Sequence, residues 1–485
     1  MKTGEMLTAF ILLSLLLYMG CENDNFPLDY QIKSIQTDKK SLSLEVGQHE
    51  QIKASTVPSV AVSPVFNWAS ADEEIAVVSD HGMVEAISEG LTFVTVSYQD
   101  IHVSIPIKVV ASGTGSAAVL YDQILNDSFP APELLVQNAG HYTSEGLYIT
   151  GKGQVAKLDK FYALAERMVQ YRLLFSSDAK AVFKSSEGDF QAYIDVAKKK
   201  MIIATNPVLE KPVEFLKSNR EYLVEIYHIY QQAIIRIVDV KTGEAAELSA
   251  THNGRGGCGK GAVQQGFNVG MQWDKYCFGL SDGSFMLVKS ITVFSLKSKV
   301  KLLIYGDSIS QPEGYFPTGD FPHSWTQLII DKLKGNAMSS GRGGGTIDML
   351  LDYIRNELPF IKSEYVMVTI GTNGGNTADK LFQLVNYIRA QGSIPILNNI
   401  PCNESGTQME INRVIDKVRR ELSVEGCRFD LATSVNGDGK EVDKSMMYWE
   451  DYSDSYGWQI YHHPNKKGSF EMFKSTMEDI PDIYK

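Results

Sequence analysis

The pattern of apolar and polar residues changes once along the chain, near residue 298. From about Ile32 to Val110, short runs alternate apolar with polar side chains, as in Ser41–Val46 and Phe93–Tyr98, and glycine or proline separates the runs. A period of two residues in short segments bounded by turn residues is typical of strands in a small antiparallel sandwich. We therefore predict an all-β domain over residues 30–110.

A second strand-rich region follows a linker of small residues at 111–116. Runs such as Tyr222–Tyr227 and Ala233–Val238 are apolar and rich in β-branched residues, and helical periodicity is weak throughout. The length of this region, residues 117–297, suits a larger sandwich of two sheets.

From residue 298 onward, strand and helix patterns alternate. Strands are predicted at about 301–305, 336–339, 365–370, 394–400 and 428–432. The intervening segments have apolar residues at helical spacing, as in Ile347, Leu350, Leu351 and Ile354, which follow a Thr346 cap. Such alternation predicts a parallel sheet with helices on both faces, in an α/β domain over residues 298–485.

Charge and the N-terminus limit the classes of function. The net charge is −12, the isoelectric point is about 5.3 and no basic run is present, so nucleic acid is excluded as a partner.

Residues 7–19 are apolar but too few to span a bilayer, and Cys21 follows them. This pattern predicts an export signal over residues 1–21.

The candidate chemistry begins where the first strand of the α/β region ends. Lys301–Tyr305 is followed by Gly306-Asp307-Ser308, which places a hydroxyl at the carboxyl edge of the sheet, where open α/β folds keep their sites. Ser308 is the candidate nucleophile, although Gly-Asp-Ser is also a common turn sequence. Three further blocks follow in order, containing Gly341, Asn373 and His463-Pro464.

These four blocks resemble those of the SGNH (GDSL) hydrolases. The resemblance implies a three-layer, flavodoxin-like fold and a serine esterase that needs no cofactor and no metal. It also implies that Ser308 is the nucleophile and His463 the base. The oxyanion hole would consist of the backbone N–H groups of Ser308 and Gly341 and the side-chain amide of Asn373, since glycine permits close approach and an amide offers neutral donors. His462 is the alternative base.

One position departs from that family. Its acidic residue normally lies three positions before the histidine, where this chain has Ile460. An imidazole without an acceptor on its second nitrogen loses control of its tautomer, so another group must hold it. We favour Asp451; Asp454, or a backbone carbonyl in a Ser/His dyad, are the alternatives.

The other regions have resemblances of their own. Residues 30–110 resemble the bacterial Ig-like group 2 domain, and residues 117–297 resemble concanavalin-type jelly rolls, in which Trp273 and Tyr276 could stack on sugars or pack in the core. The sequence before Cys21 resembles a bacterial lipobox, which implies lipidation of Cys21 and an outer-membrane, surface-exposed location; a periplasmic or secreted protein is the alternative. Pairing of Cys258, Cys277, Cys402 and Cys427 is left open.

Together these features predict a lipid-anchored carbohydrate O-acetyl esterase acting on acylated glycans. A lipase or thioesterase with a longer acyl cleft, and a glycan-binding surface lipoprotein without activity, are the alternatives. The sequence does not determine the oligomeric state, the sugar or the ester position.

Overall fold

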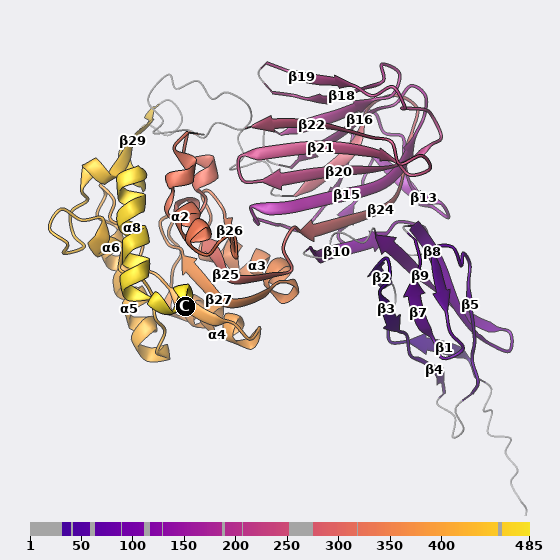
Figure 1. Cartoon of the computed structure of the whole chain (residues 1–485), viewed down its shortest axis with the longest axis horizontal. Helices are drawn as coiled ribbons and strands as arrows, with labels where there is room; N and C mark the ends of the chain where they lie inside the picture. The colour runs from indigo at the N-terminus through magenta and orange to yellow at the C-terminus, as the bar shows by residue number, and fades with distance from the viewer. Residues whose placement is uncertain are drawn as a thin grey trace, which may run out of the picture. The chain divides into compact units, whose positions relative to one another are not determined.

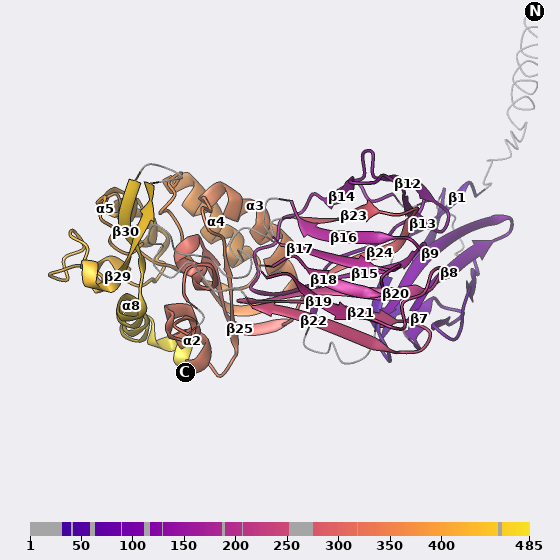
Figure 2. The ribbon, with the colours of Figure 1, turned by 90° about the horizontal axis from the view of Figure 1, so that it is seen from above.

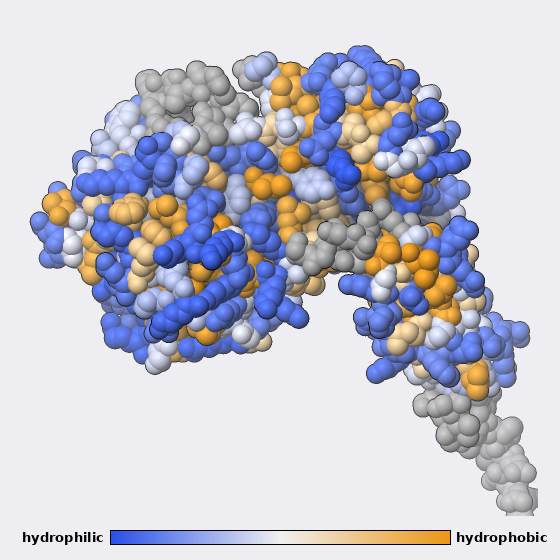
Figure 3. All heavy atoms as spheres, in the orientation of Figure 1, coloured by the Kyte–Doolittle hydropathy of each residue, from blue (hydrophilic) through white to orange (hydrophobic). Residues whose placement is uncertain are grey.

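The computed structural model describes residues 32–39, 42–58, 64–88, 90–110, 117–128, 130–186, 190–205, 207–251, 275–317, 319–453 and 458–485. The chain forms two compact units, residues 1–114 and 115–485 (Figure 1). Cys21, Cys258, Trp273 and Asp454 lie outside the described residues. No described helix is long and apolar enough to cross a bilayer. Hydrophilic residues predominate on the visible face of both units (Figure 3).

The described part of the first unit is all β. Its strands are β1 (Ser34–Thr37), β2 (Leu42–Glu45), β3 (His49–Gln51), β4 (Ala54–Val57), β5 (Asn67–Ser70), β6 (Ala76–Val78), β7 (Met83–Ala86), β8 (Gly90–Tyr98) and β9 (Ile101–Val110). They pair as β1-β4, β2-β9-β8-β5 and β3-β7-β6. Alternate residues of β8 face a core that includes Val94, Val96 and Ile105, and Trp68 packs against it. The predicted all-β domain is thus confirmed.

The second unit begins with a sandwich of two antiparallel sheets, seen from above in Figure 2. One sheet has the order β12-β13-β24-β15-β20-β21-β22, with β10 also paired to β24, and the other has the order β11-β14-β23-β16-β17-β18-β19. The bounds are β10 (Ala118–Ile124), β11 (Leu134–Leu135), β12 (Gly140–Thr143), β13 (Gly146–Ile149), β14 (Val155–Leu158), β15 (Glu166–Phe175), β16 (Lys180–Ser185), β17 (Gln191–Asp195), β18 (Lys200–Ile203), β19 (Leu209–Pro212), β20 (Glu221–Ile229), β21 (Gln232–Asp239), β22 (Ala245–Thr251), β23 (Tyr276–Asp282) and β24 (Met286–Ser295). Tyr276 is buried between the sheets, where its hydroxyl accepts a hydrogen bond from Arg167, so it packs in the core.

The rest of the second unit is an α/β fold built on a parallel sheet. The sheet has the order β26-β25-β27-β28, from β25 (Lys299–Gly306), β26 (Ala337–Gly341), β27 (Lys362–Thr369) and β28 (Ile394–Leu397). The helices are α2 (Trp325–Lys332), α3 (Ile347–Glu357), α4 (Ala378–Ala390), α5 (Gln408–Leu422), α6 (Phe429–Ala432) and α8 (Lys466–Asp479). Short 3₁₀ turns are η1 (Ser308–Ser310), η2 (Pro312–Gly314), η3 (Phe321–His323), η4 (Leu358–Phe360), η5 (Lys444–Met446) and η6 (Pro481–Tyr484). A two-stranded hairpin, β29 (Met447–Tyr452) and β30 (Trp458–Pro464), precedes α8.

Alternating residues of β25 face opposite layers, which confirms the prediction of helices on both faces. Leu302 and Ile304 pack with residues of α2 and α8, whereas Leu303 and Tyr305 pack with residues of α3, α4 and α5. Thr346 caps α3 through its hydroxyl, as predicted. The carboxyl ends of the strands therefore lie at one edge, between two layers of helices.

The predicted fifth strand is wrong. Residues 429–432 form α6, and single parallel bridges at Glu425 and Arg428 extend the sheet next to β28 instead. The prediction failed because Phe429 is apolar and buried, as a strand residue would be, but it packs against Trp325 from a helical turn.

The sandwich and the α/β fold are joined by shared packing. One apolar core contains Leu164 and Ile291 of the sandwich together with Met338 and Ile354 of the α/β fold. The backbone N–H of Ala165 donates to the carbonyl of Ser339 at 2.8 Å. The sequence predicted these regions as separate domains, whereas the structure holds them in one compact unit.

Candidate active site

Ser308 sits at the turn that ends β25. The turn is tight: a Cβ on Gly306 would lie 2.2 Å from the carbonyl oxygen of Thr369, so only glycine fits there. Asp307 then caps η1, since its carboxylate accepts the N–H of Ile309 at 3.0 Å. Ser308 opens η1 with 4% of its surface exposed. The local sequence thus presents the hydroxyl at the edge of the sheet, as the strand-and-turn pattern predicts.

Asp307 also connects two strand ends. Its second carboxylate oxygen accepts the N–H groups of Gly371 at 3.2 Å and Thr372 at 3.1 Å, just after β27. Burial raises the pKa of Asp307 to about 6, while these backbone donors favour its charged form. Asp307 therefore fixes the loop that carries Asn373 relative to the Ser308 turn, a role that the sequence motif alone did not reveal.

Gly341 ends β26, the strand on the other side of β25. A Cβ at this position would lie 2.5 Å from the carbonyl group of Ser310 and 2.7 Å from the backbone nitrogen of Gln311. The absent side chain therefore makes room for the segment just after Ser308. From the sequence, we expected a glycine here because it lets the substrate approach the main chain. The structure shows a second reason, which is that the protein's own backbone passes close to Gly341.

Asn373 follows β27, so Ser308, Gly341 and Asn373 lie at the carboxyl ends of three adjacent strands. The side-chain amide of Asn373 donates to the carbonyl of Gly345 at 3.0 Å. This bond orients the amide and uses one of its two protons.

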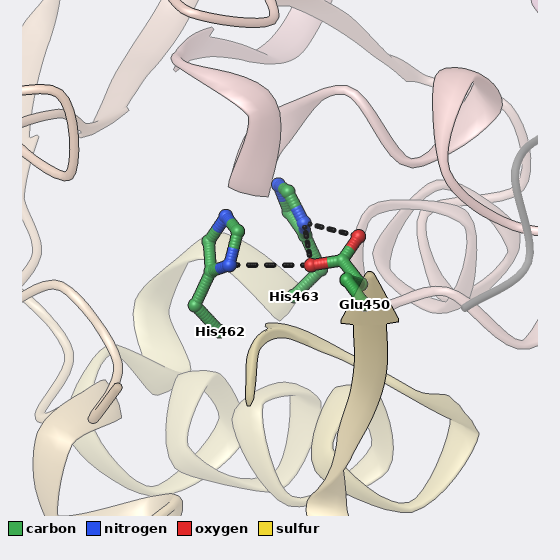
Figure 4. Close-up of side chains that lie close together, drawn as sticks. All are labelled: Glu450, His462 and His463. Carbon is green, nitrogen blue, oxygen red and sulfur yellow. Dashed lines mark hydrogen bonds and ion pairs between the residues drawn. The ribbon is translucent and has the colours of Figure 1, made fainter. Parts of the chain in front are cut away.

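His463 is held by a buried carboxylate. Its Nδ1 lies 2.8 Å from Oε1 and 2.7 Å from Oε2 of Glu450, and Glu450 is fully buried. Figure 4 shows the carboxylate of Glu450, a residue of β29, facing Nδ1 of His463, with the other ring nitrogen on the far side. A carboxylate on Nδ1 keeps the proton there and leaves Nε2 as the basic nitrogen.

The acidic partner of His463 is therefore Glu450 rather than Asp451. Asp451 is the next residue of β29, where its carboxylate accepts the N–H of Ser453 at 2.9 Å. Successive residues of a strand point to opposite sides, so a shift of one residue exchanges a buried acid for a more exposed one. Asp454, the alternative, lies outside the described residues.

The hairpin explains how Glu450 replaces the expected acid. Glu450 pairs with Ile460 across β29 and β30, and Ile460 is the position three residues before His463. The carboxylate thus comes from the neighbouring strand, directly opposite the place where the sequence lacks it. Two runs of β-prone residues, 447–452 and 458–464, flank a turn-rich segment, and this signal could have predicted the pairing.

His462 lies beside the same carboxylate. Its Nδ1 is 3.2 Å from Oε2 of Glu450, and burial lowers its pKa to about 3, so its ring is neutral at neutral pH. Among the described residues, Glu450, His462 and His463 are also a group whose ligand atoms, all within 4.8 Å of one another, could hold a metal ion. The hydrogen bonds between Glu450 and His463 account for this proximity without one.

His463 is brought to the Ser308 turn by its strand. β30 lies against η1, and His463 has 4% of its surface exposed. Tyr315 stacks on the imidazole, with ring centroids 3.9 Å apart and an angle of 24° between the rings. The nucleophile candidate, the base candidate and the candidate oxyanion donors are therefore gathered at one edge of the sheet.

A comparison with protein families agrees with the boundaries of the first unit. The family model of the bacterial Ig-like domain (group 2) matches residues 31–109, which confirms the resemblance predicted for the first unit. No curated protein sequence matches the chain.

Several solved structures are similar to part of the chain. A GDSL-like lipase from Bacteroides thetaiotaomicron is 15% identical, with 38% of this chain and 88% of that chain covered at a TM-score of 0.28. A psychrotrophic esterase from Pseudoalteromonas sp. is 19% identical, with 38% of this chain and 98% of that chain covered at a TM-score of 0.29. A lipolytic protein of the G-D-S-L family from Desulfitobacterium hafniense is 17% identical, with 38% of this chain and 100% of that chain covered at a TM-score of 0.29.

Proposed function

We propose that the protein is a serine ester hydrolase in which Ser308, His463 and Glu450 form the catalytic triad. The observation that carries this proposal is the buried Glu450 carboxylate on Nδ1 of His463, in a strand that lies against the Ser308 turn. A buried carboxylate is costly unless a partner compensates it, and a histidine oriented in this way is a general base.

The chemistry follows from the positions of these groups. The Ser308 hydroxyl attacks the ester carbonyl while Nε2 of His463 takes its proton, and Glu450 stabilises the imidazolium that forms. The N–H groups of Ser308 and Gly341 and the amide of Asn373 stabilise the negative oxygen. His463 then protonates the leaving alcohol, and water, activated by the same base, releases the acid from the acyl-enzyme.

The substrate proposed is an acetyl ester on a glycan. Tyr315 covers one face of the base, and Ser308 and His463 are both nearly buried, which favours a small acyl group over a long chain. The glycan is proposed by analogy with surface enzymes that carry appended sandwiches. Lipidation at Cys21 and an outer-membrane location are part of the same proposal.

Hydrolysis of p-nitrophenyl acetate by the full chain and by Ser308→Ala tests the reaction. The proposal expects turnover by the wild type and a loss of about 10³-fold or more in the variant, since removal of a triad nucleophile leaves only the residual contribution of binding and the oxyanion hole. Equal, slow hydrolysis by both proteins would contradict it and would favour a binding protein.

Acyl chain length and acetate release test the substrate class. Rates with p-nitrophenyl acetate, butyrate and octanoate should fall as the chain lengthens, and acetate should be released from one or more of a panel of acetylated polysaccharides. A higher rate with octanoate would instead support a lipase or thioesterase.

A further inference from the structure

The turn between β20 and β21 of the sandwich reaches into the α/β fold. Gln231 in this turn has 4% of its surface exposed. Its side-chain nitrogen lies 3.1 Å from the carbonyl oxygen of Glu313 and 2.7 Å from that of Phe316. A carboxamide nitrogen carries two protons, so both are used on one short segment, residues 313–316.

The turn itself is fixed in place. Tyr230 has a left-handed backbone (φ 52°), its N–H donates to the carbonyl of Ala165 at 2.9 Å, and its hydroxyl donates to Glu166 at 3.0 Å. Lys297 pairs with the same Glu166 at 2.7 Å. Gln231 is therefore presented by a rigid support rather than by a free loop.

The segment that Gln231 holds carries Tyr315 between the two bonded carbonyls. The ring of Tyr315 stacks on His463, and its hydroxyl lies beside Gly343, where an added Cβ would meet it at 2.8 Å. Tyr315 thus contacts both the base and the loop that follows Gly341. Gln231 supplies side-chain hydrogen bonds to the carbonyls on both sides of Tyr315, those of Glu313 and Phe316.

We propose that the sandwich is a working part of the active site, in which Gln231 is a positioning residue that acts on His463 through Tyr315. An aromatic face on an imidazole favours the cationic ring and fixes its plane. Because the imidazolium forms only as Ser308 loses its proton, this contact lowers the barrier rather than tightening substrate binding. The proposal rests on the proposed hydrolysis by Ser308 and His463.

Contacts elsewhere already join the two parts of the unit. Glu357 of α3 accepts the N–H of Leu164 at 3.2 Å and the hydroxyl of Ser340 at 2.7 Å, and its carboxylate also receives the N–H of Ala163. The loss of Gln231 should therefore leave the parts docked while the segment 312–316 loosens. A positioning role for Gln231 predicts a looser segment 312–316 in parts that stay docked, whereas a merely structural role predicts that the two parts separate.

The test compares Gln231→Glu with Gln232→Glu. The first variant keeps the size of the side chain but replaces its two donors by oxygens that face carbonyl oxygens, whereas Gln232 is the exposed neighbour in β21. With p-nitrophenyl acetate, Gln231→Glu should lower kcat at least 10-fold with KM changed less than twofold, and Gln232→Glu should change neither. Gln231→Met, which is neutral and of similar size, serves if the acidic variant does not fold.

A double-mutant cycle tests the route through Tyr315. In a Tyr315→Ala background, Gln231→Met should lower kcat by less than twofold, because the residue through which it acts is gone. Wild-type kcat in folded Gln231→Met, or the full single-variant effect in the Tyr315→Ala background, would overturn the proposal.

Hydrogen exchange separates failure of this proposal from failure of the proposed function. The N–H groups of Tyr315 and Phe316 donate to the carbonyl of Pro312 at 2.9 and 2.8 Å. Both should exchange faster in Gln231→Met and not in Gln232→Glu, whether or not Ser308 hydrolyses an ester. Unchanged exchange would refute the positioning role, whereas absent Ser308-dependent hydrolysis with faster exchange would refute only the proposed reaction and its effect on kcat.

Discussion

The choice between two neighbouring acids decides how His463 works. Glu450 is buried against Nδ1, whereas Asp451 accepts a hydrogen bond from the backbone of Ser453. Glu450→Gln keeps the shape but removes the charge and the control of the tautomer, as in a protease triad whose aspartate becomes asparagine. We expect kcat to fall by about 10³- to 10⁴-fold.

Asp451→Asn is the matched control for this prediction. Its kcat with p-nitrophenyl acetate should stay within about twofold of the wild type, since an accessible acid away from the base contributes little. A large loss in Asp451→Asn together with a small loss in Glu450→Gln would reverse the assignment.

A second buried acid predicts how stability depends on pH. Glu313 is fully buried, neither of its carboxylate oxygens has a hydrogen-bond partner among the described residues, and burial raises its pKa to about 8. The folded state holds the proton of Glu313 more tightly than the unfolded state does. Protonation of Glu313 therefore makes its full contribution to the stability of the folded state below about pH 4.5, and this contribution is lost as the pH rises toward 8.

Thermal unfolding between pH 5 and pH 8 tests this dependence. The midpoint should fall with rising pH in the wild type and fall less in Glu313→Gln, whose neutral amide does not titrate. Some slope should remain, because burial also raises the pKa of Asp307 to about 6 and that of Glu357 to about 7. Identical slopes in Glu313→Gln and in the exposed control Glu247→Gln would refute the explanation.

At the scale of single residues, the sequence predicted the positions with strong local signals. Ser308 could be inferred from the strand that ends in a glycine turn, whereas Gly341 and Asn373 were predicted from the resemblance to the SGNH hydrolases; all three lie at or just after strand ends. Glu450 was missed because its partner is 13 residues away, across a hairpin whose register depends on tertiary packing.

Among the elements, the end of β26 has little freedom to move. Gly341→Ala would place a Cβ 2.5 Å from the backbone of Ser310, so the strand end or η1 must shift. Since the same shift displaces an oxyanion donor, we expect kcat/KM with p-nitrophenyl acetate to fall about 10²-fold or more.

Gly319→Ala is the control, because nothing lies within 4 Å of a Cβ there. It should change kcat/KM by less than about twofold. If Gly341→Ala retained wild-type kcat/KM, the close approach of β26 to the Ser308 turn would not matter for catalysis.

Element prediction succeeded where periodicity was unambiguous and failed where it was short. The long amphipathic pattern of α3 and the alternating run of β8 both appear as predicted. Residues 429–432 are too few to separate a buried helical turn from a strand by apolar content, and the isolated bridges beside them show how close the alternatives are.

At the scale of the whole molecule, the packing predicts that the second unit folds as one body. A chain of residues 115–485 should keep wild-type kcat/KM and unfold in one calorimetric transition. A chain of residues 298–485 should be insoluble or inactive, because it exposes core residues such as Met338 and leaves Glu357 without the N–H of Leu164.

Soluble, fully active residues 298–485 would contradict this prediction. The sequence did not reveal the shared core, because each region has its own complete apolar pattern. The interface includes strand residues such as Ile291 and loop and turn residues such as Leu164 and Gln231, and their partners lie far along the chain.

The most direct test of the triad is covalent labelling of the full chain with a fluorophosphonate, followed by mass spectrometry of its peptides. The Ser308 oxygen should displace fluoride from phosphorus, which adds the phosphonyl group to the peptide containing Ser308. Labelling should be lost in His463→Ala and slowed in Glu450→Gln. An unmodified Ser308 in the wild type, or equal labelling of all three proteins, would contradict the account.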